Sequence, residues 1–254
     1  MKVKNADWYK TIWSLDIKNQ SWVEDTDRQV DFIIRTLKLK GTERILDLAC
    51  GYGRHALNFA RKGFQVVGVD ITKSYIEDAL STTKSESINA SFILSDIRDI
   101  KFENEFDVVL NLADGAIGYL EDDNENLKIF DVIANALKPG GKHMMDICNA
   151  EHAETYFPTT HWEAGEKAIA LSKFEWDSEK RIMLYGGKDI PYGSPVEKPE
   201  ILYGDPTRLY SINELEGIFK ERNLRIINTF STFYGKEASP KEMQLIVYSE
   251  KLTS

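Results

Sequence analysis

The sequence predicts an α/β fold: a doubly wound, mostly parallel seven-stranded sheet that carries an antiparallel β insertion. Two observations predict it. Between residues 43 and 147, short apolar runs alternate with helical segments, which is typical of parallel strands covered by helices on both faces. After residue 150 the alternation stops, and it returns near residue 209. A chain of 254 residues is long enough for one such domain with an insertion.

Helices are predicted where apolar residues recur at helical spacing between residues that start or end a helix. In residues 25–41, Asp25 or Thr26 can cap the first turn and Gly41 can end the helix. The apolar positions of this segment are Val30, Ile33, Ile34 and Leu37. The other predicted helices cover residues 54–63, 72–83, 122–141 (ended by Pro139 and two glycines) and 211–224.

Seven apolar runs are predicted to form the strands of the sheet. They are ERILDLA (43–49), FQVVGVD (64–70), ASFILSD (90–96), FDVVLNL (106–112), KHMMDI (142–147), RIINTFSTF (225–233) and MQLIVYS (243–249).

Three regions follow from this pattern. Residues 1–149 and 209–254 are expected to form the core, and residues 1–24 are expected to form an aromatic lid with Trp8, Tyr9, Trp13 and Trp22. Residues 150–208 are the expected insertion, with antiparallel hairpins over 161–189 that turn near 163–166 and 177–180. Most of the prolines then follow, so residues 191–208 are expected to be a loop-rich connection.

Composition excludes several classes of protein. The formal charge is -9 and no basic stripe is present, so no nucleic-acid partner is expected. Cys50 and Cys148 have neither metal-ligand nor disulfide-framework spacing, so no metal is expected. No apolar run is long enough to span a membrane, and the first residues do not resemble a signal peptide, so a cytoplasmic location without membrane partners is expected.

The segment ILDLACGYGRHA (45–56) is a strand, a glycine turn and the start of a helix. Gly51 and Gly53 allow the backbone to turn sharply and to approach a ligand closely, and the helix that follows offers free N–H groups. Asp70 ends the next strand, where a carboxylate can accept hydrogen bonds from both ribose hydroxyls of an adenosine.

Asp47 indicates which nucleoside this turn accepts. A carboxylate beside a pyrophosphate is repulsive, whereas a carboxylate beside an ammonium or a sulfonium is favourable. In addition, Ala56 replaces the third glycine of a dinucleotide motif. Both observations disfavour a nicotinamide-dependent oxidoreductase and favour a cationic, phosphate-free nucleoside such as S-adenosyl-L-methionine.

Four segments in order resemble the class I, Rossmann-like S-adenosylmethionine-dependent methyltransferases. ILDLACGYGRHA resembles their first motif, GVDIT the second and SDIRDI the adenine-contacting segment, and FDVVLNL, LKPGGKHMMDI and MQLIVYS continue the series. The resemblance covers roughly residues 26–149 and 208–250. The chain is also similar to a small-molecule subgroup that includes amino-sugar N-methyltransferases and shares the ending Arg208, Tyr210, Ser211, Glu214 and Leu215.

The resemblance implies the roles of individual residues. The expected cofactor-binding residues are Asp47, Ala49, Gly51 and Gly53 at the methionine portion, Asp70 and Ile71 at the ribose and adenine, Asp96 and Ile97 at the adenine, and Asn111 and Leu112 below the sulfur. No general base is identified. Tyr9 is the candidate for a residue near the sulfonium, since an aromatic face attracts a cation. His143 lies in an apolar strand and is expected to be a core residue.

The expected reaction is in-line methyl transfer to the nitrogen or oxygen of a small molecule. The run N/D-P-P-Y/F of amino-methylating nucleic-acid enzymes is absent after the fourth strand, and no Pro-Cys pair is present for attack on cytosine. A protein or RNA methyltransferase and a non-catalytic S-adenosylmethionine-binding module remain the alternatives. The insertion is expected to hold the acceptor, and the protein is expected to be a monomer or a homodimer.

Overall fold

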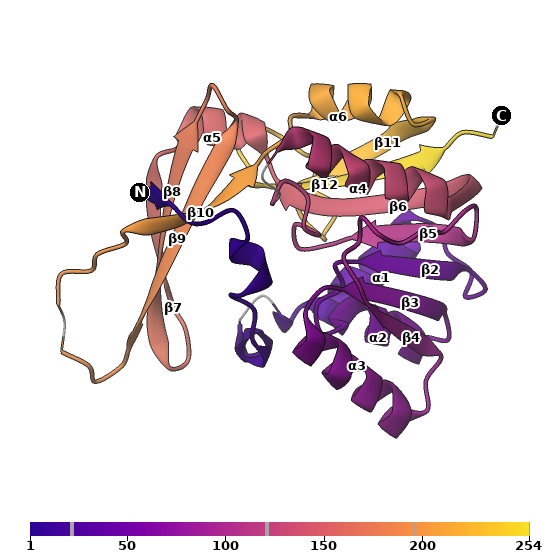
Figure 1. The fold of residues 1–254 in the computed structure, drawn as a ribbon, viewed down its shortest axis with the longest axis horizontal. Coiled ribbons are helices and arrows are strands. Elements are labelled where there is room, and N and C mark those ends of the chain that lie inside the picture. The colour runs from indigo at the N-terminus through magenta and orange to yellow at the C-terminus, as the bar shows by residue number, and fades with distance from the viewer. Residues whose placement is uncertain (21–22, 120–121, 196, 254) are drawn as a thin grey trace.

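The computed structural model describes residues 1–20, 23–119, 122–195 and 197–253, so Trp22 lies outside the described residues. Seven strands form a mixed sheet in the order β11-β12-β6-β5-β2-β3-β4 (Figure 1). β12 runs antiparallel to both β6 and β11, and the other pairs are parallel. The strands are β2 (Arg44–Leu48), β3 (Gln65–Asp70), β4 (Ala90–Leu94), β5 (Phe106–Asn111), β6 (Leu137–Cys148), β11 (Leu224–Phe230) and β12 (Gln244–Lys251). The predicted seven-stranded sheet is confirmed.

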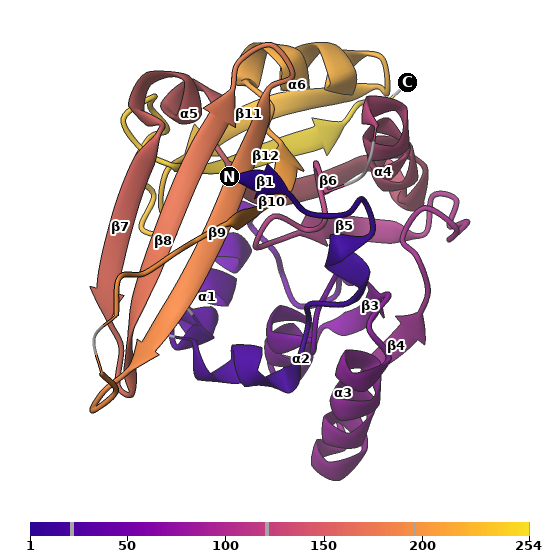
Figure 2. The ribbon, with the colours of Figure 1, turned by 60° about the vertical axis from the view of Figure 1, so that its left-hand side comes forward.

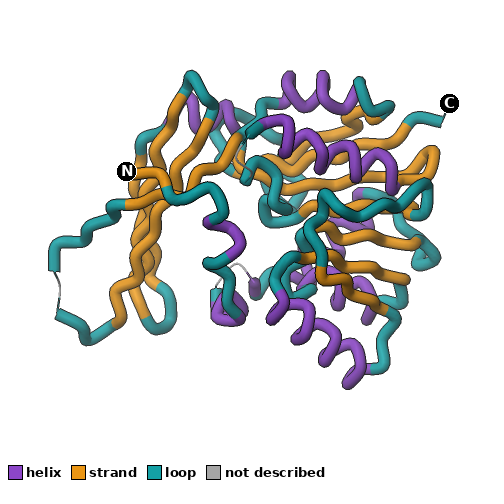
Figure 3. The backbone as a smooth tube through the Cα atoms, viewed as in Figure 1, coloured by secondary structure: helices purple, strands orange, loops and turns teal. Residues whose placement is uncertain are grey.

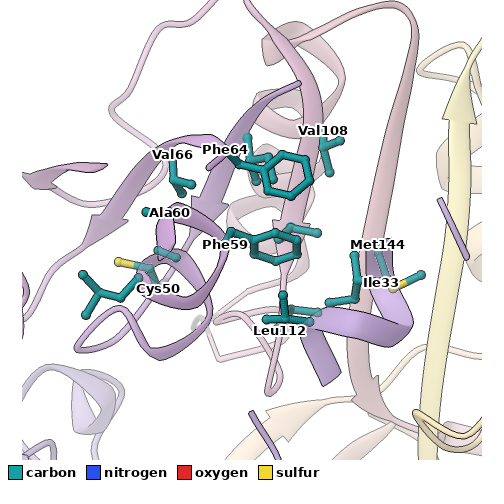
Figure 4. Close-up of a cluster of buried hydrophobic side chains, with 14 of the residues drawn as sticks. Ile33, Cys50, Phe59, Ala60, Phe64, Val66, Val108, Leu112 and Met144 are labelled. Carbon is teal, nitrogen blue, oxygen red and sulfur yellow. The ribbon is translucent and has the colours of Figure 1, made fainter. Parts of the chain in front are cut away.

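Helices cover both faces of this sheet (Figure 3). They are α1 (Thr26–Thr36), α2 (Arg54–Arg61), α3 (Lys73–Glu86), α4 (Asp123–Ala136) and α6 (Ile212–Lys220). Alternate side chains of a strand point to opposite faces, so Ile45 joins a cluster with Phe59 of α2, whereas Leu46 joins a cluster with Phe130 of α4. Figure 4 shows the first cluster, in which Phe59 and Phe64 meet edge to face. Packing on both faces fixes the seven-stranded sheet, so the carboxyl ends of its parallel strands lie together at one edge.

A second sheet stands beside the carboxyl ends of the parallel strands (Figure 2). Its order is β1-β10-β9-β8-β7, with β1 (Lys2–Val3), β7 (Thr159–Ala164), β8 (Ala168–Asp177), β9 (Ile182–Pro191) and β10 (Tyr203–Arg208). β7, β8 and β9 pair antiparallel, as predicted for the hairpins, and β10 also pairs antiparallel with β9. α5 (Ala150–Tyr156) connects this sheet to β6 and packs against it through Ala153.

Several elements differ from the expectation. Residues 203–208 were expected in a loop but form β10, which accommodates Pro206 because β1 pairs only with Tyr203 and Gly204. β1 and α5 are too short for a periodic pattern and were not predicted. The region expected as a lid also contains two 3₁₀ helices, η1 (Trp8–Lys10) and η2 (Leu15–Asn19).

The junction between the second sheet and α6 explains the ending shared with the small-molecule subgroup. Ser211 and Glu214 form a capping box at the start of α6. The Glu214 carboxylate also pairs with Arg208 of β10 at 2.6 Å and with Arg181 at 2.8 Å. The Tyr210 hydroxyl donates to Asp123 Oδ1 at 2.6 Å. These polar residues therefore fix the second sheet to the core.

Replacing the cap at this junction should destabilise the protein. Ser211→Ala removes the side chain that accepts from the Glu214 N–H, so we expect a loss of about 1 kcal/mol in the free energy of unfolding. Urea denaturation measures the change. Ser85→Ala, at an exposed position of α3, serves as the control and should change stability by less than about 0.5 kcal/mol. Equal stability of the two variants would contradict a role for the cap.

Candidate functional site

A cavity of about 850 Å³ lies between the strand ends and the second sheet. Three parts of the chain line it: the carboxyl ends of the parallel strands, one face of the second sheet and the N-terminal segment. Open α/β sheets bind ligands at this edge, because several loops converge there.

The glycine turn after β2 gives its two glycines different surroundings. Ala49, Gly51 and Gly53 all have positive φ, of 54°, 57° and 79°. Gly51 lines the cavity, and a Cβ there would come no closer than 3.9 Å to another residue. Gly53 does not line the cavity, and a Cβ there would lie 2.8 Å from the Phe92 ring. Gly51 therefore keeps space for a ligand, whereas Gly53 keeps space for the core.

This difference predicts that alanine at Gly53 mainly lowers stability, whereas alanine at Gly51 mainly weakens ligand binding. Both alanine variants must adopt a left-handed backbone, which costs roughly 1–2 kcal/mol. Gly53→Ala adds a clash with Phe92 and should lower the melting temperature further than Gly51→Ala. Gly51→Ala places a methyl group in the cavity and should weaken binding of S-adenosylhomocysteine more. Thermal unfolding and calorimetry measure the two effects, and the reverse order in either would refute the assignment.

Asp70 holds the walls of the cavity together. Its Oδ2 accepts from the Gly51 N–H and its Oδ1 from the Thr72 N–H, each at 2.8 Å. The carboxylate thus joins the glycine turn to the start of α3 while still lining the cavity. Burial raises its pKa, although these backbone hydrogen bonds oppose the rise. Each oxygen accepts one bond from the backbone, and a carboxylate oxygen has a second lone pair for a ligand hydroxyl.

Asp47 is a buried carboxylate with an unsatisfied oxygen. The residue is 2% exposed, and its Oδ2 has no hydrogen-bond partner among the described residues. Burial raises its pKa to about 7, with Arg54 opposing the rise and Asp70 adding to it. A buried acceptor without a hydrogen bond raises the free energy of the folded protein, and a ligand that donates to it or carries a positive charge removes that penalty. The site therefore fits a cationic group and does not fit a phosphate.

The strand-end residues expected at the adenine also lie on the cavity wall. Asp96, Ile97 and Ile71 line it. Asp96 forms a bidentate ion pair with Arg98, in which Arg98 Nη2 lies 2.6 Å from Asp96 Oδ2. Burial acts to raise the pKa of Asp96, but the hydrogen bonds and charge of Arg98 lower it below its ordinary value. Asp99, the other aspartate of this segment, is exposed and does not line the cavity. The wall position therefore favours Asp96 over Asp99 for contact with a ligand.

Asn111 and Leu112 were expected together below the sulfur, but they lie differently. Leu112 lines the cavity. Asn111 is fully buried, does not line the cavity and donates from Nδ2 to the Gly115 carbonyl at 3.1 Å. The Asn111 side chain thus shapes the loop after β5 and does not form part of the described wall.

The N-terminal segment closes one side of the cavity with Trp8, Tyr9 and Trp13. It is held on α3, because the Tyr75 hydroxyl donates to the Ser14 carbonyl at 2.9 Å and Lys18 pairs with Asp78 at 2.6 Å. Figure 1 shows the segment passing between the two sheets. Tyr9, the sequence candidate near the sulfonium, is 5% exposed and lies on the wall.

Several residues line the cavity that were not among the expected site residues. Asp114 and Tyr119 lie in the loop after β5, and Arg54 starts α2. His55 also reaches the wall, where its Nε2 lies 2.8 Å from Gln29 Oε1. His143 is a buried core residue bonded to Ser249, and burial lowers its pKa to about 3, so it stays neutral as a core residue.

The described part of the chain lacks two features, a cluster of metal ligands and a membrane-spanning helix. No group of three or more His, Cys, Asp or Glu side chains there is arranged to hold a metal ion. Likewise, none of the helices in that part is both long and apolar enough to cross a membrane.

Comparison with known proteins gives consistent results. Residues 39–217 match the family described as "Methyltransferase domain". YqeM of Bacillus subtilis strain 168, named as a methyltransferase, is 31% identical over 228 residues, which cover 89% of this chain and 90% of that protein. An S-adenosylmethionine-dependent methyltransferase from Clostridium acetobutylicum ATCC 824 has a TM-score of 0.75 at 19% identity, covering 94% of this chain and 97% of that one. The S-adenosylmethionine-bound amino pentose methyltransferase CalS10 from Micromonospora echinaspora has a TM-score of 0.63 at 16% identity, covering 92% and 93%.

Proposed function

The chain belongs to the class I S-adenosylmethionine-dependent methyltransferases, and we propose that its acceptor is a small molecule held between the strand ends and the second sheet. S-adenosylmethionine, when bound, supplies an electrophilic methyl group on a sulfonium. Asp47, Ala49, Gly51 and Asp70 are the residues proposed to hold it, with Ile71, Asp96, Ile97 and Leu112 further along the wall.

One observation carries the proposal of a small-molecule acceptor. Cross-strand partners share a face of a sheet, and Phe174, Tyr185 and Asp205 form one such row across β8, β9 and β10. The residues of that face line the same cavity as the proposed cofactor residues; they are Ala170, Ser172, Phe174, Met183, Tyr185, Gly187, Asp189, Asp205 and Thr207. This face, which we call the inner face, thus lies opposite the place where a methyl group would be presented.

The cavity also has the character of a small-molecule site. Trp8 and Phe174, both buried, contribute apolar walls, and polar groups such as Ser172 and Thr207 lie between the aromatic residues. Small-molecule sites combine such apolar walls with a few polar groups. The acidic chain disfavours RNA. The printed name of CalS10 describes a methyltransferase of an amino pentose, a small molecule.

In this account the protein contributes alignment and exclusion of water. In this proposal the N-terminal segment with Trp8, Tyr9 and Trp13 acts as a lid, the second sheet, which β1 joins, acts as the acceptor layer, and the seven-stranded core holds the cofactor. Holding two reactants in line can lower a barrier by roughly 7–11 kcal/mol. The buried Trp8 and Tyr9 keep water from the proposed reaction space.

The test of this function is a transfer assay. The protein is incubated with a metabolite extract and S-adenosylmethionine that carries a labelled methyl group, with parallel reactions on total protein and total RNA. We expect label in the small-molecule fraction. Label that appears only in protein or RNA would overturn the small-molecule proposal, and cofactor binding without transfer to any fraction would favour the non-catalytic module.

Blocking the inner face tests the location of the acceptor. Ser172→Trp fills the centre of the inner face, so we expect at least a tenfold loss of methylation with S-adenosylhomocysteine affinity changed by less than about threefold. Thr160→Trp is the matched control, since Thr160 is exposed on the opposite face of the neighbouring strand. Equal methylation by the two variants would show that the acceptor does not bind at the inner face.

A further inference from the structure

We propose that the acceptor is an amine that binds in its protonated form, and that the Asp114 carboxylate receives the proton that its nitrogen must lose. This inference rests on the proposed function, because it names the substrate class of the same cavity.

Asp114 is placed at the centre of the strand ends. It follows β5, which lies between β2 and β6 in the sheet. Its N–H donates to the Asp146 carbonyl at 2.7 Å, and the Tyr119 hydroxyl donates to its Oδ2 at 3.2 Å. The residue lines the cavity and is half-buried. Asp114 is therefore held from two sides while part of it remains accessible from the cavity.

Asp114 has no cationic partner among the described residues. Three cationic side chains line the cavity, Arg54, Arg98 and Lys188. Arg98 pairs with Asp96 and Glu125, each at 2.6 Å, and Arg54 donates to Thr26 and Gln29. Burial raises the pKa of Asp114, which makes the carboxylate a stronger proton acceptor. A protonated amine is the ligand that would compensate this buried charge.

Independent features of the wall favour the same ligand class. The ring centroids of Trp8 and Tyr119 lie 4.9 Å apart, the Tyr119 hydroxyl contacts Asp114, and Phe174 and Tyr185 of the inner face line the same cavity. Aromatic faces attract ammonium groups. Trp8 is 6% exposed and its Nε1–H has no partner among the described residues, so an acceptor atom elsewhere on the ligand can meet it. Asp189 and Asp205 add negative charge at the inner face, where Lys4 neutralises only Asp205.

The chemistry requires a proton acceptor for this substrate. A protonated amine has no lone pair, so it cannot attack carbon. One N–H proton passes to the Asp114 carboxylate, and the freed nitrogen lone pair forms the C–N bond while the C–S bond breaks and its electron pair remains on sulfur. The products are the methylated ammonium, the protonated Asp114 and the neutral thioether S-adenosylhomocysteine, which together balance the atoms and charges. Asp114 returns its proton to solvent after product release.

The transfer assay distinguishes this inference from the proposed function. With the metabolite extract as the probe, we expect the labelled products to be basic amines, retained on cation exchange and identified by mass analysis. Label on hydroxyl, carboxyl or thiol metabolites would overturn the amine inference and leave the small-molecule function standing. Label confined to macromolecules, or no transfer, would overturn both.

A variant tests the role of Asp114 on the amine so identified. Asp114→Asn keeps the shape of the side chain, so S-adenosylhomocysteine affinity should stay within about threefold, while kcat at neutral pH should fall by roughly 10²–10⁴-fold. Asp31→Asn, at an exposed position of α1, is the control and should keep the parent kcat.

Recovery at high pH separates a proton acceptor from a structural residue. The described titratable groups around Asp114 are Tyr119 on its own loop, Asp146 and Cys148 on β6 and, next to Tyr119, Asp205 on β10. None of these groups is cationic, but the Arg54 guanidinium of α2, which also lines the cavity, acts on Asp146 and opposes the rise of its pKa. Raising the pH toward the pKa of the amine supplies free amine from solution, so the kcat of Asp114→Asn should rise toward the parent value. Parent-like kcat at neutral pH, or a loss without recovery, would overturn the assignment.

Discussion

Asp70→Ala should weaken S-adenosylhomocysteine binding by roughly 10²–10⁴-fold. The expected ribose contacts are two hydrogen bonds to a charged acceptor, each worth about 1.5–3 kcal/mol, and about 1.4 kcal/mol corresponds to a factor of ten in affinity. The substitution also removes the acceptor that joins Gly51 to Thr72, so the walls of the cavity should become less well ordered. Calorimetry with S-adenosylhomocysteine measures the loss.

The control for this experiment is Asp99→Ala. Asp99 is an exposed aspartate of the segment after β4 and does not line the cavity, so its replacement should leave the affinity unchanged. Thermal unfolding without ligand shows whether Asp70→Ala still folds. A folded Asp70→Ala variant with parent affinity would mean that Asp70 only holds the two loops together.

Asp47→Asn should have effects of opposite sign on affinity and on stability. The substitution removes the negative charge that would face the cationic part of the cofactor, so we expect roughly 10- to 100-fold weaker binding. It also removes a buried carboxylate whose Oδ2 has no hydrogen-bond partner among the described residues, so the ligand-free protein should melt at a higher temperature above neutral pH. Calorimetry and thermal unfolding at pH 8 measure the two changes.

The gain in stability should depend on pH with a defined sign. The pKa of Asp47 in the folded protein is raised to about 7 from an ordinary value of 3.8. The folded state therefore binds more protons than the unfolded state between these values, and this group destabilises the protein increasingly as the pH rises through that range. The advantage of Asp47→Asn should be small near pH 4 and complete above neutral pH. An advantage that shrinks as the pH rises would contradict this account.

The sequence predicts the cofactor side of the cavity well because of a general property of parallel sheets. Asp70 and Asp96 each end an apolar run, Asp47 lies near the end of another, and the carboxyl ends of parallel strands meet at one edge. Their convergence on one cavity therefore follows from the strand pattern alone. Their contacts with a bound cofactor remain a prediction.

Other features depend on contacts between distant residues, which no local pattern encodes. Gly53 belongs to the turn motif, yet its neighbour is Phe92 of β4, and Asn111 is turned into the loop after β5. β1 is two residues long and exists as a strand only because β10 offers it an edge. Asp114 and Tyr119 lie in a loop with positive φ at four successive residues, 113–116, where neither helical nor strand periodicity applies.

A crystal structure of the protein with S-adenosylhomocysteine tests the central claim most directly, namely that one cavity holds the cofactor at the strand ends and the acceptor against the inner face. We expect the ribose hydroxyls on Asp70, the amino group of the ligand near Asp47 and the thioether sulfur facing the inner face across free space. A ligand that occupies the inner face itself, or that binds away from Asp47 and Asp70, would contradict the account.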